Sequence, residues 1–310
     1  MNGASPRVLT VQTTAAHAGC TVRSVLRAQL HMADSLLSHL KFVPNAILCD
    51  GAPVRLRQTL RGGETLCVTL DETKHGVSVR SAATSLDIRY EDEDIIVLNK
   101  PAGIAVHGAP QCERATLADA LAAYWGAERP FRPVSRLDRG TSGAMVVAKS
   151  RYVHDRLRTM LHTSDFRRTY LAVVVGEGLP ARGEVTLPIA RSASGGYKRT
   201  VDPNGQAAYT SFEALVAGGG CTLLRLTLQT GRTHQIRVHM GALGHPLVGD
   251  ALYGTADARI ARHALHSAGI SLVHPVRGAR IDVEAPLPQD MAQLCQACGF
   301  DIEDILGDCK

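Results

Sequence analysis

Residues 136–143 (Arg-Leu-Asp-Arg-Gly-Thr-Ser-Gly) place one carboxylate in a polar turn directly before the apolar run 144–148. That run is short, contains two valines and follows a glycine, which is typical of a buried strand. Asp138 is therefore expected in a loop at a sheet, between Arg136 and Arg139. Cationic neighbours favour the ionised form of a carboxylate, and an ionised Asp can act as a nucleophile. A surface ion pair would give the same local pattern, so the rest of the chain must distinguish the two.

The composition sets broad limits on fold and partners. The 310 residues are 45% hydrophobic, enough for one large core and a smaller one. A net charge of +5 is compatible with a polyanionic partner, whereas the 4% aromatic content argues against extensive base stacking on exposed rings. No apolar run approaches the roughly 18 residues of a membrane span, and no signal peptide is apparent. We therefore expect a cytoplasmic chain, and a monomer.

The cysteines give little indication of a metal site. Eight are scattered along the chain, and in the expected compartment they stay reduced. Cys295 and Cys298 have the spacing of a zinc-binding pair, with Cys309 beyond them, but no second pair or histidine completes four ligands. His234 and His239 are five residues apart, not the four of an HExxH motif. We expect no metal and no cofactor, and assign the cysteine pair to the surface of an amphipathic helix.

The first part of the chain predicts a compact basic module. Apolar spacing favours two short helices within 21–40, a strand, Asp-Gly turn and strand over 46–54, and another strand over 66–70. Residues 71–85 are polar and weakly periodic, which is typical of a linker. The clustered positive residues of this module could equally form an ordinary solvated face of a small domain. Its cationic residues are Arg23, Arg27, Lys41, Arg55, Arg57 and Arg61.

From Ile88 onward, strands alternate with helices, and a Gly-Gly-Gly turn predicts antiparallel pairing of two of the strands. The chain is therefore expected to be an α+β protein with a mixed, mainly antiparallel central sheet. Residues 1–80 would form the small N-terminal domain, with a linker to about residue 87, and residues 88–310 the larger one. The predicted strands are 94–99, 144–148, 169–175, 208–216 and 221–228, and the predicted helices are 116–124, capped by Thr116, and 151–161, capped by Ser150.

Four segments in this larger domain carry a family resemblance: residues 91–107, 136–143, 166–174 and 228–250. At these residues the chain closely resembles the RluA-type pseudouridine synthases, which isomerise uridine within structured RNA. The match extends from about Ile88 to Met291, and the N-terminal module more loosely resembles an S-four-like RNA-binding domain. One residue departs from the family pattern, because Ser135 stands where the family usually has His.

The resemblance implies catalytic roles for three residues. Breaking and remaking a glycosidic bond needs a carboxylate that attacks, or stabilises, an electron-poor centre, and Asp138 fits that role. Arg237 would pair with Asp138 and hold it ionised, and Tyr170 would pack on the target base and relay a proton at carbon 5. Thr233 is expected to cap the helix that carries Arg237. Apolar spacing places Ile236, Met240 and Leu243 on one stripe of that helix.

The resemblance also implies contacts to RNA. Arg136 would fill the space left when the target uridine leaves its stack, and Ile236 would form the pocket floor. His234 and His239 would be structural or face the RNA. The expected phosphate contacts are Lys100, Arg139, Arg167, Arg168 and Arg232.

Two other functions remain open from the sequence. The segment 138–141 also resembles the aspartyl loop of phosphotransferases, but Gly140 stands where those enzymes need a second acidic residue. A non-catalytic RNA-binding protein on the same scaffold is the other alternative, and together Asp138, Tyr170 and Arg237 argue against it. The expected partner is RNA, with large-subunit ribosomal RNA and transfer RNA as the two candidates.

Overall fold

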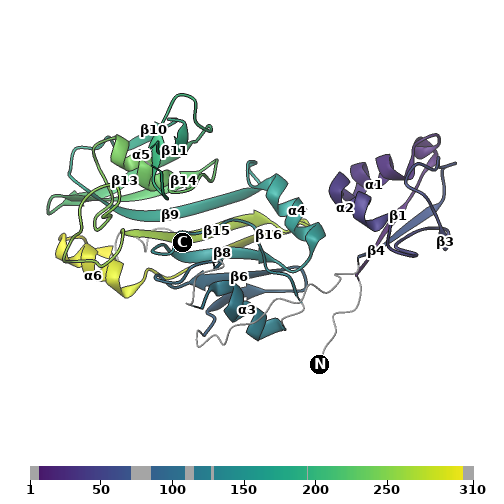
Figure 1. The fold of residues 1–310 in the computed structure, drawn as a ribbon, viewed down its shortest axis with the longest axis horizontal. Coiled ribbons are helices and arrows are strands. Elements are labelled where there is room, and N and C mark those ends of the chain that lie inside the picture. Colours follow the sequence, from purple (N-terminus) through teal and green to yellow (C-terminus); the bar gives the residue numbers. More distant parts are fainter. Residues whose placement is uncertain (1–6, 71–84, 109–114, 127–128, 194, 303–310) are drawn as a thin grey trace.

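The computed structural model describes residues 7–70, 85–108, 115–126, 129–193 and 195–302. The predicted linker falls almost entirely outside these residues, as does Cys309. Figure 1 shows a small N-terminal module beside a larger domain built on one long sheet. Within the described residues, every helix is too short or too polar to cross a bilayer.

The N-terminal module is a four-stranded antiparallel sheet carrying two short helices. The predicted helix pair is confirmed, with α1 ending where His31 adopts a left-handed conformation. The predicted hairpin is also confirmed, because Asp50 and Gly51 have the positive φ angles, 50° and 80°, that a tight turn requires. Its elements are β1 (Arg7–Gln12), α1 (Val22–Leu30), α2 (Asp34–Leu40), β2 (Ile47–Cys49), β3 (Ala52–Pro53) and β4 (Thr65–Leu70).

The larger domain contains a ten-stranded sheet in which only β8 and β15 pair in parallel, so the predicted mixed, mainly antiparallel sheet is confirmed. Eight strands run in the order β10-β13-β14-β9-β15-β8-β6-β5, while β7 and β16 pair at the sides of β8 and β15. The strands are β5 (Ile88–Glu91), β6 (Ile95–Lys100), β7 (Arg132–Pro133), β8 (Ser142–Ala148), β9 (Phe166–Val175), β10 (Arg182–Val185), β13 (Thr210–Gly218), β14 (Cys221–Leu228), β15 (Leu265–Val273) and β16 (Arg280–Glu284).

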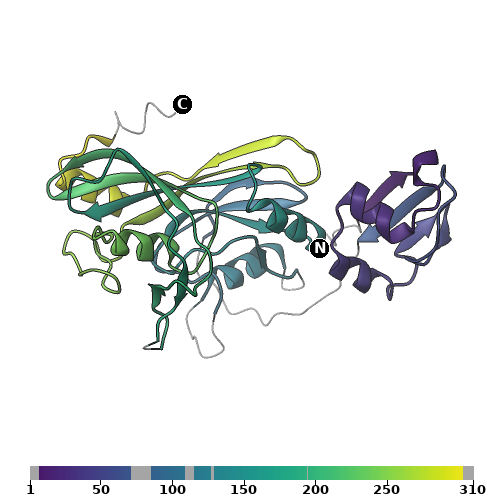
Figure 2. The same ribbon diagram turned by 90° about the horizontal axis from the view of Figure 1, so that it is seen from above.

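Helices cover both faces of this sheet. The two predicted helices are confirmed: Thr116 caps α3 (Leu117–Trp125) and Ser150 caps α4 (Arg151–Met160) through their side-chain oxygens. The helices α3 and α5 (Gln235–Ala242) pack in one apolar cluster on one face of the sheet, α4 packs in a second cluster, and α6 (Gln289–Ala297) packs in a third cluster on the opposite face. In Figure 2 the green α5 and blue α3 lie below the sheet.

Side-chain alternation along β9 decides which face each residue serves. Tyr170, Ala172 and Val174 belong to the apolar cluster shared with α3 and α5, because alternate residues of a strand point to the same face. Val173 belongs to the cluster under α6 on the opposite face. The face with Tyr170 is therefore the one on which the site is assembled.

Two predictions about helices were wrong. The helix α5 begins at Gln235 and its N-cap is His234, not Thr233. Cys295 in α6 and Cys298 at its C-cap are buried, 0% and 4% exposed, rather than on a helix surface. Burial among apolar neighbours accounts for the cysteine pair without a ligand.

A hairpin that the sequence did not predict, β11 (Ile189–Arg191) and β12 (Arg199–Val201), stands off the main sheet near α5. In the described part of the chain, the N-terminal module and the larger domain share one apolar cluster and two polar contacts. The Tyr152 hydroxyl donates to the Leu30 carbonyl over 2.9 Å, and Arg7 pairs with Asp94.

Candidate active site

Asp138 lies in the loop between β7 and β8, as the flanking sequence predicted. The neighbouring Leu137 is 7% exposed and anchors the loop in the apolar cluster, while the Thr141 amide closes a turn on the Asp138 carbonyl. The Asp138 side chain itself is 25% exposed. The loop is thus fixed at both ends while its carboxylate faces accessible space.

One arginine joins Asp138 to a second carboxylate. Arg237 comes from the first turn of α5 and donates from Nη1 to Asp138 Oδ2 over 3.0 Å. Its Nε and Nη2 donate to the two oxygens of Asp250 over 2.7 and 2.8 Å. A fork of this kind fixes the plane of a guanidinium. The pairing of Arg237 with Asp138 was expected, whereas the part played by Asp250 was not.

The two carboxylates differ in access. Asp250 is 1% exposed and also accepts amides from Leu252 and Tyr253. Burial opposes its charge, but the bonds from Arg237 outweigh burial, so the pKa of Asp250 is lowered. Burial likewise opposes the charge of Arg237, and Asp250 and Asp138 reverse that effect and raise its pKa. Both shifts favour the ionised form of the buried pair, and Asp138 is the more exposed of the two carboxylates.

Lys100 supports the Asp138 loop from beneath. Its side chain is 0% exposed, and the ammonium donates to the carbonyls of Pro101, Ile104 and Arg139. Burial, with the nearby Arg262, lowers its pKa to about 7. Lys100 was predicted to contact phosphate, but a fully buried ammonium bonded to three carbonyls is not available to RNA.

Two further residues hold the same loop and were missed in the sequence. Arg262 donates to the Gly140 carbonyl over 2.9 Å, and His263 lies 2.9 Å from the Thr141 hydroxyl. A β-carbon on Gly140 would sit 2.8 Å from the His263 ring, so this position requires glycine. Both residues come from the segment before β15, more than 100 residues away. No local pattern connects them to Asp138.

Tyr170 and Ile236 lie in the same apolar cluster as Leu137, so the structure brings the predicted pocket residues together. Tyr170 is 5% exposed and Ile236 3% exposed. Burial raises the pKa of Tyr170, which keeps its hydroxyl neutral. The site therefore has an apolar wall beside the Arg237–Asp138 pair.

The remaining predicted arginines occupy different surroundings. Arg136 and Arg139 are exposed beside Asp138, and Arg139 donates to the Gly103 carbonyl over 2.8 Å. Arg232 is partly exposed and donates to the Ala207 carbonyl. Arg168 is 3% exposed, near the carbonyls of Leu228 and Thr230, so the prediction that it contacts phosphate does not fit. Arg167 is exposed on the face opposite Tyr170.

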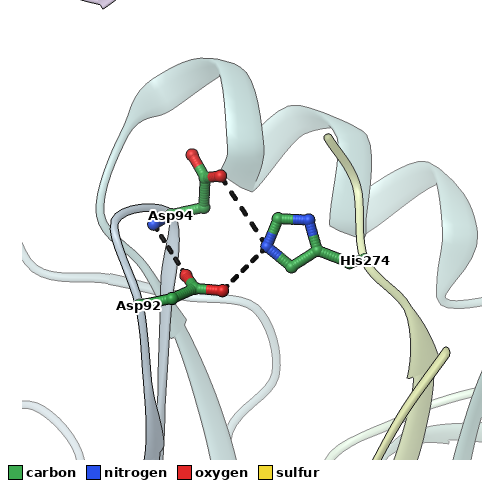
Figure 3. Close-up of side chains that lie close together, drawn as sticks. All are labelled: Asp92, Asp94 and His274. Atoms are coloured by element: carbon green, nitrogen blue, oxygen red, sulfur yellow. Dashed lines mark hydrogen bonds and ion pairs between the residues drawn. The ribbon is translucent and has the colours of Figure 1, made fainter. Parts of the chain in front are cut away.

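A second acidic cluster, of Asp92, Asp94 and His274, lies away from this site and is drawn in Figure 3. His274 Nδ1 accepts the amides of Val276 and Arg277, so its proton is on Nε2, 3.0 Å from Asp92 Oδ2. An imidazole in this state offers no lone pair at Nε2 to a metal ion.

Positive side chains complete that cluster. Arg277 lies 3.2 Å from Asp92, and Arg7 pairs with Asp94. Asp92 Oδ1 also accepts the amides of Asp94 and Ile95. With its carboxylates bonded in this way, the donor set does not fit a cation and serves the fold.

Comparisons with known proteins give the family of this chain. The family model described as RNA pseudouridylate synthase matches residues 94–242, which include Asp138, Tyr170 and Arg237. The "Uncharacterized RNA pseudouridine synthase YjbO" of Bacillus subtilis is 38% identical over 86% of this chain and 95% of its own. "Ribosomal large subunit pseudouridine synthase D" of Nitrosomonas europaea is 39% identical over 80% of this chain and 75% of its own.

A solved structure shares the fold. "Human RNA Pseudouridylate Synthase Domain Containing 1" superposes with a TM-score of 0.56 at 26% identity, covering 71% of this chain and 97% of that one. Sequence and structure therefore lead to one assignment: the chain belongs to the RNA pseudouridylate synthase family and is an RNA pseudouridine synthase, an isomerase that converts uridine to pseudouridine.

Proposed function

We propose that the substrate is a specific uridine in large-subunit ribosomal RNA and that Asp138 is the catalytic carboxylate. The names of relatives such as the Nitrosomonas europaea enzyme support the ribosomal substrate. The observation that carries the catalytic assignment is the contrast between a 25% exposed Asp138 and a 1% exposed Asp250 on one arginine.

The chemistry fits an ionised carboxylate beside a fixed guanidinium. Isomerisation breaks the bond between uracil N1 and the sugar, turns the base, and joins carbon 5 to the sugar, with a proton leaving carbon 5 and one gained at N1. Asp138 serves as nucleophile, on carbon 6 or on the sugar, or as stabiliser of a glycal route. Arg237 pairs with it in each of these routes, and Tyr170 and Ile236 pack against the base.

Arg136 is assigned to base flipping. A uridine in folded RNA must leave its stack to reach Asp138, and unstacking costs a few kcal/mol. Arg136 is exposed two residues before Asp138, so its side chain is free to enter the vacated space. Its role would then concern the RNA fold and leave the bond chemistry to Asp138.

The N-terminal module is assigned to RNA affinity as an S-four-like domain. Arg55, Arg57 and Arg61 are exposed on the segment between β3 and β4. Exposed cations of this kind release counterions from RNA on binding. The module would thus raise affinity and contribute little to the chemical step.

The substrate is identified by mapping pseudouridine in total RNA from cells with and without the gene. We expect one or a few positions in large-subunit ribosomal RNA to revert to uridine. Reversion confined to transfer RNA would replace the ribosomal substrate and leave Asp138 as the catalytic residue. An unchanged map would contradict the substrate assignment altogether.

A further inference from the structure

His234 is held at the edge of the site by an unusual backbone conformation. It is the residue before α5 and has a φ of 60°, in the left-handed region. Asn, Asp and His enter this region more readily than most residues. Gln235 closes the turn, because its side-chain oxygen accepts the Arg232 amide over 2.9 Å and the Thr230 hydroxyl over 2.8 Å. These bonds therefore hold the backbone that carries the His234 ring.

The Tyr253 hydroxyl favours one position of the proton on His234. The Tyr253 hydroxyl oxygen accepts the Arg199 amide over 2.8 Å, and it lies 2.9 Å from His234 Nδ1. A backbone amide can only donate, so the hydroxyl proton is available for Nδ1. A neutral imidazole that accepts at Nδ1 bears its hydrogen at Nε2.

The Nε2 hydrogen faces Asp138. His234 Nε2 lies 3.7 Å from Asp138 Oδ2, the oxygen that also accepts from Arg237. Contacts of this length in a substrate-free site commonly shorten when substrate binds. Among the residues that the structure describes, none donates a hydrogen bond to Asp138 Oδ1. Both donors thus address one oxygen and leave the other free.

We propose that His234, set in its Nε2–H form by Tyr253, is a positioning residue that orients Asp138 so that Oδ1 faces the uridine. The proposal rests on the catalytic role of Asp138 proposed above. Arg237 binds Oδ2 through only one nitrogen, so with Arg237 as the single donor the Asp138 carboxylate could still rotate about that contact. A second donor on Oδ2 from another direction removes that freedom, and pre-orientation of this kind lowers the barrier.

The surroundings keep His234 neutral. Burial lowers its pKa, and Arg237 and Arg199 act in the same direction against Asp138 and Asp250. A neutral imidazole suits the role, because a second full positive charge on Asp138 would weaken it as a nucleophile. The Arg237 guanidinium carbon also lies over the Tyr253 ring, 5.0 Å from the ring centroid. Tyr253 therefore contacts both Arg237 and His234.

Two substitutions of His234 distinguish a role in orienting Asp138 from a role in capping α5. His234→Asn suits the left-handed backbone and reaches Tyr253, but has no nitrogen at the level of Nε2. His234→Gln places an amide nitrogen at that level. In single-turnover assays we expect His234→Asn to slow the reaction by about tenfold without changing RNA affinity, and His234→Gln to recover most of that loss.

The probe is RNA purified from cells that lack the gene and labelled with tritium at carbon 5 of uridine, which is released on isomerisation. Tyr253→Phe removes the proton that sets the tautomer, so we expect it also to slow the chemical step by a few fold. Thermal unfolding establishes that each variant is folded.

Wild-type rates for His234→Asn and Tyr253→Phe would overturn the proposal, as would equal slowing by His234→Asn and His234→Gln. Asp138→Asn on the same RNA keeps the two hypotheses apart. An active Asp138→Asn enzyme contradicts the proposed function, whereas an inactive one beside a fully active His234→Asn contradicts only the positioning role.

Discussion

Two clusters in this protein contain the same kinds of residue, two aspartates with arginine and histidine. They differ in whether a carboxylate oxygen remains accessible. Around Asp92 and Asp94, the two carboxylates are largely enclosed, with side chains 9% and 2% exposed, and the His274 Nε2 proton points to them. Around Arg237, only Asp250 is enclosed, and Asp138 keeps one oxygen free. Composition therefore does not distinguish a site from a structural cluster; the unsatisfied, accessible oxygen does.

The largest expected effect is a loss of activity that occurs in the Asp138 cluster and not in the Asp92 cluster. Asp138→Asn keeps the shape of the side chain and removes its charge, so we expect the isomerisation rate to fall by at least about a thousandfold. Tritium release from uridine carbon 5 measures this loss, and circular dichroism checks the fold. A rate within about tenfold of the parent would remove Asp138 from the mechanism.

Asp92→Asn is the matched substitution in the other cluster. It leaves His274 and Arg277 short of a charged partner, so we expect the free energy of unfolding to fall by about 2–3 kcal/mol with activity retained. Burial opposes the charge of Asp92, but Tyr90, the Ile95 amide, His274 and Arg277 outweigh it and lower its pKa.

The pH dependence of that loss has a defined sign. Because the native pKa of Asp92 is lowered, its contribution is present above the unfolded value of about 3.9 and is lost as pH falls through the native value. Urea unfolding of both proteins from pH 3 to 7 should show the difference shrink at the acid end. A constant difference would contradict the charged role of Asp92.

A substitution of Lys100 tests whether its buried hydrogen bonds stabilise the Asp138 loop. Lys100→Met fills similar volume but leaves three buried carbonyls without a donor, so we expect a loss of about 2–3 kcal/mol in stability near pH 9. The native pKa of about 7 lies below the unfolded value of about 10.4. Between these values the unfolded chain binds more protons, so the stability due to Lys100 rises with pH.

Urea unfolding of the wild type and Lys100→Met at pH 6 and pH 9 measures this rise. We expect the difference between the two proteins to be larger at pH 9. A larger difference at pH 6 would mean that the buried ammonium is the favoured form and would contradict the lowered pKa.

Arg136→Ala should have a smaller effect, and only on folded RNA. If Arg136 fills the space of the flipped base, the variant should be slowed by about tenfold on a stem-loop and little on an unstructured strand with the same uridine. Arg237→Ala is the control, because loss of the partner of Asp138 slows both substrates alike. Equal slowing of both substrates by Arg136→Ala would remove the base-flipping role.

The smallest expected effect concerns the N-terminal module. Exchanging Arg55, Arg57 and Arg61 for Gln should reduce the magnitude of the slope of log affinity against log salt by up to about two, with the chemical rate unchanged. Filter binding at several salt concentrations measures the slope. An unchanged slope would mean that this face of the module does not contact RNA.

Local signals in the sequence predicted much of the fold. The caps Thr116 and Ser150 and the Asp50–Gly51 turn act within a few residues, and each appears where expected. Thr233 has the same chemistry as those caps, but the helix starts after His234 because Gln235 closes the turn with its own side chain. One local bond there replaced another, because the Gln235 side chain took the place that the capping preference of Thr233 predicted.

The site was predicted less completely, for a related reason. Asp138, Tyr170 and Arg237 were named from motifs. His263 and Tyr253 were missed because His263 meets Thr141 across 122 residues and Tyr253 meets His234 across 19, and neither belongs to a local pattern. Lys100 was misassigned because a lysine in sequence resembles a surface cation. Only the fold shows that it is 0% exposed and bonded to three carbonyls.

The most direct test replaces the gene in its own organism with the Asp138→Asn and Asp92→Asn versions and maps pseudouridine in total RNA. At equal protein levels, we predict that the target uridine stays unmodified with Asp138→Asn and is modified normally with Asp92→Asn. Normal modification by Asp138→Asn, or loss of modification by an abundant, folded Asp92→Asn protein, would contradict the account.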